Sequence, residues 1–193
     1  MTATIILAAG GSTRLGRAKQ TLPFQNKSLL QHSIDTAVGA DIGAVIVVIG
    51  ANEEEIGAEL KNQDIRLLIN NHWIDGMATS IKEGITAVIG SEKAIDNIIL
   101  MVCDQPYVHE QLLQTMVHTR KTSGKTIVAC SYKDTVGVPA LFDRVHFAEL
   151  LALKGDEGGK KLLKKRQGSV AIIPFAAGAV DIDTEQDYEA LNK

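Results

Sequence analysis

Length, composition and charge exclude several classes of protein. The chain has 193 residues, of which 45% are hydrophobic and 22% are charged, as in ordinary globular proteins. A formal net charge of −3 argues against a nucleic-acid-binding protein with a broad basic face. A chain of this length suits one domain whose core needs neither a disulfide nor a metal. We therefore expect a single domain over residues 1–193.

Cysteine usage and the length of the apolar runs predict a cytoplasmic protein. Cys103 and Cys130 lie in apolar runs without CxxC spacing, which is typical of buried, reduced thiols. The longest apolar runs, 44–51 and 98–103, are much too short to span a bilayer. Residues 1–7 lack the basic start and the cleavage site of a signal peptide. We expect neither a membrane nor a nucleic acid among the partners.

Short apolar runs alternate with segments of helical periodicity along the chain. The expected strands are rich in Ile and Val, as strands buried on both faces are, and they lie at Thr4–Leu7, Ala44–Ile49, Arg66–Ile69, Asn97–Val102, Thr126–Cys130 and Val170–Ile173. Helices are expected after capping-box starts at Ser28, Asn52 and Ser80, and over His109–Arg120, Val145–Leu153, Gly159–Arg166 and Asp187–Leu191. This alternation predicts an α/β fold, a single-domain Rossmann-like three-layer sandwich with a mostly parallel sheet.

The segment directly after the first strand is the first candidate for chemistry, because ligands of such sheets bind at the carboxyl ends of the strands. Its glycines let the backbone approach a ligand, and consecutive N–H groups can hold a phosphate. Arg14 and Lys19 add positive charges suited to a polyphosphate. The spacing fits neither a Walker A loop nor the GxGxxG dinucleotide fingerprint. A glycine-rich turn with incidental surface cations is the alternative interpretation.

Carboxylates follow the fourth predicted strand and lie near the C-terminus. Asp104 ends a very apolar strand, where it could hold a hard cation such as magnesium, although Asp is also a common turn residue. Asp181 and Asp183 share one face of an extended segment. Asp104 and Asp183 could share one magnesium ion together with substrate phosphates. Alternatively, Asp183 only supports a helix start formed by Thr184 and Asp187.

Other segments carry weaker signals. Gly76 and Ser80 could hold a ribose or a base, although capping of a helix by Ser80 is the default interpretation. Residues 137–142 form a turn followed by an apolar pair, which plain packing would also explain. The five histidines show no metal-ligand spacing, and Ser12 has no visible His–Asp partnership for acyl transfer.

Together these motifs resemble those of the MocA-like molybdenum cofactor cytidylyltransferases, within the MobA-like NTP transferase superfamily. The resemblance spans nearly the whole chain. The matching motifs are LAAGxSxRxGxxK at Leu7–Lys19, Leu22-Pro23, Trp73–Met77 leading to Ser80, Asp104-Gln105-Pro106, Gly137–Pro139, Gly155–Gly158 and Asp181–Thr184.

The resemblance implies a nucleotidyltransferase that transfers CMP from CTP to molybdopterin and releases pyrophosphate. It implies catalytic roles for Lys19, Arg14 and Asp104, and Mg²⁺ held by Asp104 and Asp183. The residues expected to contact the nucleotide are Ala8, Ala9, Gly10, Gly11, Ser12, Thr13, Gly76 and Ser80. The Ala8-Ala9 pair resembles the cytidine branch, since the guanylyltransferase branch has glycine at the second position. A transient contact with a molybdenum enzyme or its chaperone also follows from the resemblance.

The sequence departs from the family pattern at two places. Gln25-Asn26 stands where a glycine is usual, but Asn tolerates the same left-handed backbone. Gly159-Lys160 replaces the usual alanine and arginine, which leaves the acceptor open because Lys cannot reproduce a bidentate fork. The basic run 160–166 that follows is otherwise interpreted as a solvated helix face.

Three other functions remain as alternatives. A GTP-dependent guanylyltransferase, or a transferase acting on another sugar or alcohol phosphate, would use the same fold. A non-catalytic nucleotide- or cofactor-binding carrier would keep the pocket without turnover. A flavin or nicotinamide oxidoreductase is disfavoured by the absence of GxGxxG.

Overall fold

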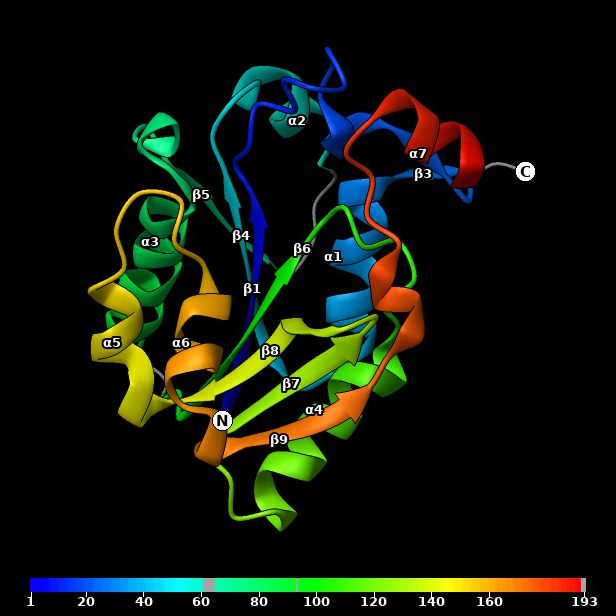
Figure 1. Cartoon of the computed structure of the whole chain (residues 1–193). Coiled ribbons are helices and arrows are strands. Elements are labelled where there is room, and N and C mark those ends of the chain that lie inside the picture. Colours follow the sequence, from blue (N-terminus) through cyan, green and yellow to red (C-terminus); the bar gives the residue numbers. More distant parts are fainter. Residues whose placement is uncertain (61–64, 93, 192–193) are drawn as a thin grey trace.

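A seven-stranded, mostly parallel sheet forms the centre of the computed structural model, which describes residues 1–60, 65–92 and 94–191 (Figure 1). The strand order is β5-β4-β1-β6-β8-β7-β9, and only β8 runs antiparallel to its neighbours β6 and β7. The strands are β1 (Thr2–Ala8), β4 (Gly43–Ile49), β5 (Ile65–Ile69), β6 (Asn97–Val102), β7 (Ile127–Tyr132), β8 (Thr135–Asp143) and β9 (Val170–Pro174). The predicted α/β fold is confirmed.

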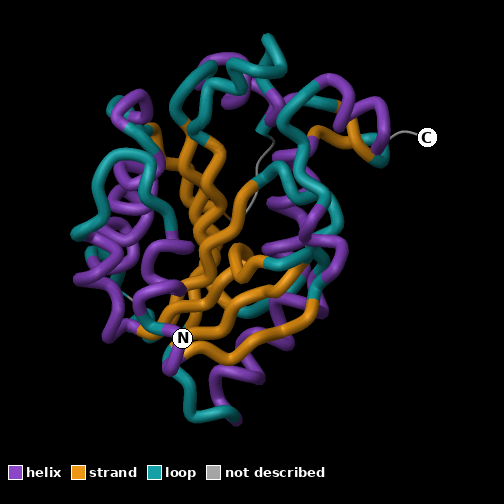
Figure 2. Tube along the Cα trace, in the orientation of Figure 1, coloured by secondary structure: helices purple, strands orange, loops and turns teal. Residues whose placement is uncertain are grey.

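Helices cover both faces of this sheet, which gives the three predicted layers (Figure 2). On one face pack α1 (Leu29–Gly39), α2 (Glu53–Glu59) and α4 (Glu110–Thr122), and on the other α3 (Met77–Ile89), α5 (Phe147–Leu151) and α6 (Gly159–Lys165). Alternate residues of β1 enter the two cores: Ile5 packs with the α3 side and Ile6 with the α1 side. No helix in the described ranges is long and apolar enough to cross a membrane.

The strand β8 was missed in the sequence analysis. Residues 137–142 lie inside this strand instead of forming a turn, and Val138-Pro139 is a cis peptide. Gly137 and Pro139 obscure the apolar pattern, so that the segment does not read as a buried strand. A second omission is the two-residue pair β2 (Pro23–Phe24) and β3 (Lys27–Ser28). Its turn confirms the left-handed backbone expected at Asn26, where φ is 65°.

Of the three predicted capping-box starts, those at Ser28 and Asn52 are confirmed as the places where helices begin, whereas the start at Ser80 is wrong. The Ser28 hydroxyl accepts a hydrogen bond from the Gln31 N–H at 3.2 Å, as an N-cap should. Asn52 instead has a φ of 58°, and from this left-handed backbone its side chain caps nothing in α2. Ser80 lies inside α3, because the chain turns into the helix four residues earlier at Gly76, whose φ is 103°.

The later helices agree more closely with the sequence analysis. The helix expected over Val145–Leu153 is a 3₁₀ turn at Arg144–His146 followed by α5. The last helix, α7 (Glu185–Leu191), follows the predicted start, where Thr184 and Asp187 exchange backbone-to-side-chain hydrogen bonds. The basic residues of α6 are exposed, as predicted for a solvated helix face. Cys103 and Cys130 are free and buried, also as predicted.

Candidate active site

The glycine-rich loop after β1 is held in shape by Gln20, a residue that the sequence analysis did not single out. The Gln20 side chain is buried, and its Nε2 donates to the carbonyl oxygens of Ala8 at 2.7 Å and Gly10 at 2.9 Å. The Ser12 hydroxyl accepts a hydrogen bond from the Lys19 N–H at 3.1 Å. Ser12 itself has a φ of 50°, so the loop turns back on itself at this residue. The loop is therefore a preformed backbone cradle.

Lys19 lies between two carboxylates that come from distant parts of the chain. Its Nζ donates to Asp104 Oδ2 at 2.6 Å and to Asp183 Oδ1 at 3.0 Å. Asp104 lies two residues after the end of β6, at the carboxyl end of the sheet, and Asp183 lies between β9 and α7. Arg14 Nη2 bonds the other oxygen of Asp183 at 2.7 Å. The structure thus brings together the four charged residues that the sequence analysis selected.

Burial and the attraction between opposite charges shift the pKa values of these side chains in opposite directions. Burial lowers the pKa of Lys19, but the charge of Asp104 and hydrogen bonds to Asp104 and Asp183 outweigh it, so that the net pKa is raised. Burial raises the pKa of Asp104, and the nearby Lys19 offsets this only in part. At Asp183, burial is the largest single effect and raises the pKa, but the hydrogen bonds and charges of Lys19 and Arg14 together outweigh it, so that the net pKa is lowered. Lys19 therefore stays cationic at neutral pH.

A cleft of about 360 Å³ opens beside the cluster. Its polar wall includes Lys19 and Asp104, and its loop wall includes Ala9, Gly10, Gly11 and Thr13. Its remaining lining comes mainly from Leu7, Trp73, Ile74, Gly76, Met77, Ser80, Val102 and Asp156. Two expected nucleotide contacts do not line this cleft, because the Ala8 side chain packs into the core and the Ser12 hydroxyl is engaged within the loop.

The start of α3 forms the wall of the cleft opposite the charged cluster. The buried Ser80 hydroxyl accepts a hydrogen bond from Asn70 Nδ2 at 2.9 Å. The Ala78 N–H donates to the Gly155 carbonyl at 3.0 Å, which ties the loop 154–158 to the first turn of the helix. A side chain at Gly76 would lie only 2.3 Å from the Gly155 carbonyl carbon, so this close approach requires glycine. The contact brings Asp156 to the rim of the cleft.

The carboxylates of Asp104 and Asp183 have the chemistry of a hard-cation site. Both converge on one point, the Lys19 ammonium, and carboxylate oxygens are the ligands that Mg²⁺ and Mn²⁺ prefer. Within the described residues, no cluster of three or more His, Cys, Asp or Glu side chains could hold a metal. A cation here would therefore take its other ligands from substrate oxygens and water. It is Asp183, not Asp181, that contacts Lys19 and Arg14.

A parallel sheet with a glycine-rich loop after its first central strand, and with cations and carboxylates at the carboxyl ends, defines a nucleotide-binding α/β protein. The sequence model of the MobA-like NTP transferase domain matches residues 4–170, and the chain belongs to this family. The protein is therefore a nucleotidyltransferase, as the sequence analysis predicted.

Several known proteins are similar to this chain over nearly its whole length. Nicotine blue oxidoreductase of Paenarthrobacter nicotinovorans is 26% identical, with 97% of this chain and 95% of that protein covered. Purine catabolism protein PucB of Bacillus subtilis is 27% identical, with 98% and 95% covered. The crystal structure of Rv0371c from Mycobacterium tuberculosis is 28% identical with a TM-score of 0.86, covering 98% of this chain and 96% of that one. A structure of Rv0371c in complex with manganese has a TM-score of 0.82 at 27% identity, covering 98% and 97%.

Proposed function

We propose that the protein transfers CMP from CTP to molybdopterin and releases pyrophosphate. The observation that carries this proposal is the Lys19 ammonium set between Asp104 and Asp183 beside the preformed loop. A triphosphate needs cations and backbone N–H groups around it, and a divalent ion needs the two carboxylates. The motifs at Leu7–Lys19 and Asp181–Thr184, which resemble the cytidylyltransferase branch, support this choice of reaction.

The proposed reaction is attack of the molybdopterin phosphate on the α-phosphorus of CTP. The phosphorus–oxygen bond to pyrophosphate breaks as the new one forms. A phosphate nucleophile is already ionised at neutral pH, so the site needs no general base. In our proposal, Lys19 and Arg14 neutralise charge on the departing pyrophosphate, and the N–H groups of the loop 10–13 orient the phosphates. Bound Mg²⁺, held by Asp104 and Asp183, would supply further charge neutralisation.

The preference for CTP rests on the Ala8-Ala9 pair. Ala9 lines the cleft, and a side chain at Gly50 would lie 3.0 Å from the Ala9 Cβ. This wall is therefore closely packed beside the loop where we place the nucleotide. GTP is the first alternative donor, and other sugar or alcohol phosphates are alternative acceptors. We also propose that the protein acts in the cytoplasm as a single nucleotidyltransferase domain, delivering its product through transient contact with a molybdenum enzyme.

A redox function is the second candidate, because a similar protein is named an oxidoreductase over nearly the same length. The glycine-rich loop distinguishes a nucleotidyltransferase from a dinucleotide-dependent oxidoreductase. Its spacing lacks the GxGxxG fingerprint of dinucleotide sites. Direct binding of NADPH and CTP to the purified protein separates the two functions, since a redox protein would take up the former and a cytidylyltransferase the latter.

The decisive experiment measures pyrophosphate release from CTP and from GTP with Mg²⁺ and freshly prepared molybdopterin. Release from CTP that depends on molybdopterin is the expected result. Release from GTP but not from CTP would contradict the proposed nucleotide, although the proposed mechanism of transfer would still apply. Tight CTP binding without release, for molybdopterin and for a panel of alternative phosphate acceptors, would show a carrier instead of an enzyme.

A further inference from the structure

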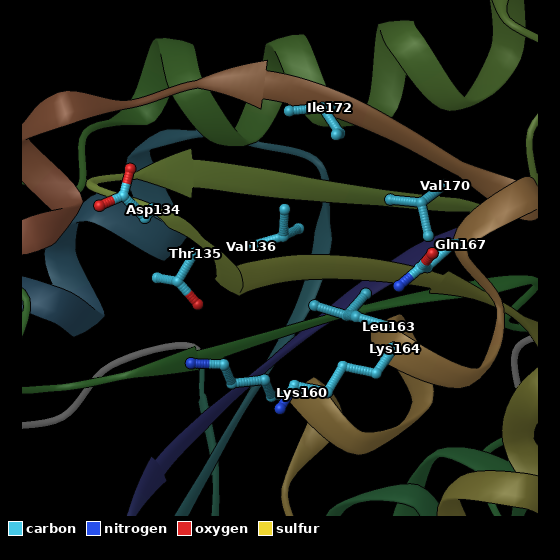
Figure 3. A pocket seen from close by; sticks show the side chains of 9 residues that line it. All are labelled: Asp134, Thr135, Val136, Lys160, Leu163, Lys164, Gln167, Val170 and Ile172. Carbon is cyan, nitrogen blue, oxygen red and sulfur yellow. The ribbon is translucent and has the colours of Figure 1, made fainter.

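A groove of about 340 Å³ lies outside the cleft, between α6 and the outer strands of the sheet. Figure 3 shows its apolar floor, formed by Val136 of β8, Val170 and Ile172 of β9, and Leu163 of α6. Ile172 is an apolar strand residue with 55% of its surface exposed. The volume falls in the range of small-molecule sites, which combine mostly apolar walls with a few polar groups.

Two lysines of α6 border this groove without a partner. Lys160 and Lys164 line it, and the ammonium group of neither makes an ion pair or hydrogen bond with any described residue. The other basic side chains of the same run have acidic partners: Lys161 pairs with Glu157, and both Lys165 and Arg166 pair with Glu149. Among the described residues of this basic run, the two lysines whose side chains lack an acidic partner are thus the two that line the apolar groove. An occupant complementary to this groove has an apolar body and an anionic group.

A short stretch of the chain connects the cleft to the groove. Asp156 lines the cleft and Lys160, four residues later, lines the groove. Between them, a side chain at Gly158 would lie 2.8 Å from the sulfur of Met77, another residue of the cleft. The loop 154–158 and the first turn of α6 therefore form one continuous border from the reacting centre to the groove.

We propose that this groove is a subsite for the part of the acceptor that does not react. The subsite takes an organic anion with an apolar body, held by Lys160 and Lys164 over the floor of Val136 and Ile172. On the other side of the groove, at the hairpin between β7 and β8, the Thr135 hydroxyl can form hydrogen bonds, and the Asp134 carboxylate repels an anion, which favours placing the anionic group at the lysines. This inference rests on the proposed function in one respect: the acceptor is assumed to react in the adjoining cleft.

Binding of 8-anilinonaphthalene-1-sulfonate tests the subsite without turnover, because this probe joins a sulfonate to an aromatic body. CTP is added in excess so that the probe cannot report on the cleft. We expect the double variant Lys160→Gln/Lys164→Gln to weaken probe binding about tenfold or more, since one lost charged hydrogen bond alone has about this effect. Separately, Ile172→Asp should weaken binding about tenfold, because it places a like charge in the apolar floor. The matched control Lys161→Gln/Lys165→Gln removes two charges from the same helix outside the groove and should bind the probe as the wild type does.

Equal probe affinity in all four proteins would overturn the subsite, and circular dichroism of each variant excludes misfolding as the cause of a loss. Steady-state kinetics then test its link to the acceptor. The Lys160→Gln/Lys164→Gln variant should raise the KM for the acceptor about tenfold and leave the KM for CTP unchanged. An unchanged acceptor KM, with probe binding lost, would overturn the assignment to the acceptor. If no acceptor turns over in the wild type, the proposed function fails, and displacement of the probe by the candidate acceptors still decides whether they occupy the groove.

Discussion

Lys19 is the residue where the loop, the strand end and the C-terminal segment meet. Its ammonium is largely shielded, with 15% of the side chain exposed, and it contacts Asp104, whose side chain is 18% exposed. A buried ion pair of this kind is weak evidence for stability, because desolvation of both charges opposes their attraction. Its presence at the mouth of a cleft is better explained by function, since perturbed ionisable groups concentrate at functional sites.

Replacement of Lys19 by Ala should lower kcat/KM for CTP by about 100-fold or more, the scale typical of a lost preorganised charge. The same loss is expected for Asp104→Ala, through the metal. The matched control is Lys27→Ala, which removes an exposed lysine paired with Asp35 on the surface. Steady-state pyrophosphate release measures all three. Near-wild-type turnover in Lys19→Ala would remove this residue from the proposed catalytic set.

Replacement of Gln20 by Ala should both destabilise the protein and disturb the loop. The Ala8 and Gly10 carbonyls lose their buried donor, and an unsatisfied buried group costs about 1–3 kcal/mol. Urea unfolding should show this loss, and the KM for CTP should rise because the loop is no longer braced. An unchanged KM in a clearly destabilised variant would limit Gln20 to a structural role.

At the scale of elements, the close approach of α3 to β1 sets one wall of the cleft. A side chain at Gly84 in α3 would lie 2.7 Å from Cγ2 of Ile5, a fully buried residue of β1. Gly84→Ala should therefore destabilise by about 1–3 kcal/mol through overpacking, reduced by about 1 kcal/mol of gained helix propensity. Gly57 in α2 has open space around it, so Gly57→Ala should stabilise by about 0.5–1 kcal/mol. Denaturant unfolding of both variants checks the opposite signs.

The contact between α5 and α6 should make stability depend on pH. Hydrogen bonds from Lys165 and Arg166 lower the pKa of Glu149 to about 2 from its ordinary 4.5. A carboxyl with a depressed folded-state pKa stabilises the fold above its unfolded value, and this contribution is lost as the pH falls from about 4.5 toward 2. Because the pair lies near the surface, we expect about 1 kcal/mol.

The Tm of the wild type should exceed that of Glu149→Gln by about 2–4 °C at pH 6. The difference should shrink when the same scans are run at pH 4 and pH 3. A gap of constant size across this range would mean that the carboxylate charge is not what joins the two helices.

The sequence predicted elements best where burial dominates and worst where local backbone geometry decides. Six strands were found because their Ile and Val runs are continuous, whereas Gly137 and Pro139 hid β8. The closeness of Lys19 and Asp104 could be predicted, because ligands of such sheets bind at the carboxyl ends of the strands and both residues follow strand ends. The role of Gln20 could not be predicted from the sequence, because a side-chain amide that donates to loop carbonyls follows no recognisable spacing of residues. Ser80 was misplaced because the turn at Gly76, which starts α3, depends on its contact with Gly155.

At the scale of the whole molecule, the C-terminal segment returns to the start of the chain. Figure 1 shows α7 beside the N-terminal β3, although the two are far apart in sequence. The Arg17 guanidinium pairs with Glu185 at 2.7 Å and lies over the ring of Tyr188. The Ile182 side chain is fully buried with Leu22 and Phe24, and its N–H donates to the Asp104 carbonyl at 3.0 Å. The site is thus complete only when this segment is docked.

Ile182→Ala should therefore release Asp183 without unfolding the sheet. A buried Ile-to-Ala change normally costs about 2–5 kcal/mol, but a segment that opens locally limits the global loss to the free energy of its own docking. We expect faster hydrogen exchange in residues 180–188, little change in β1 and β6, and weaker binding of Mn²⁺ in the presence of CTP. The comparison variant is Ile56→Ala, which removes an equally buried Ile side chain from the core on the α1 face of the sheet and should leave exchange at 180–188 unchanged. Uniformly faster exchange in Ile182→Ala would show instead that this segment folds together with the sheet, so that the site could not open by itself.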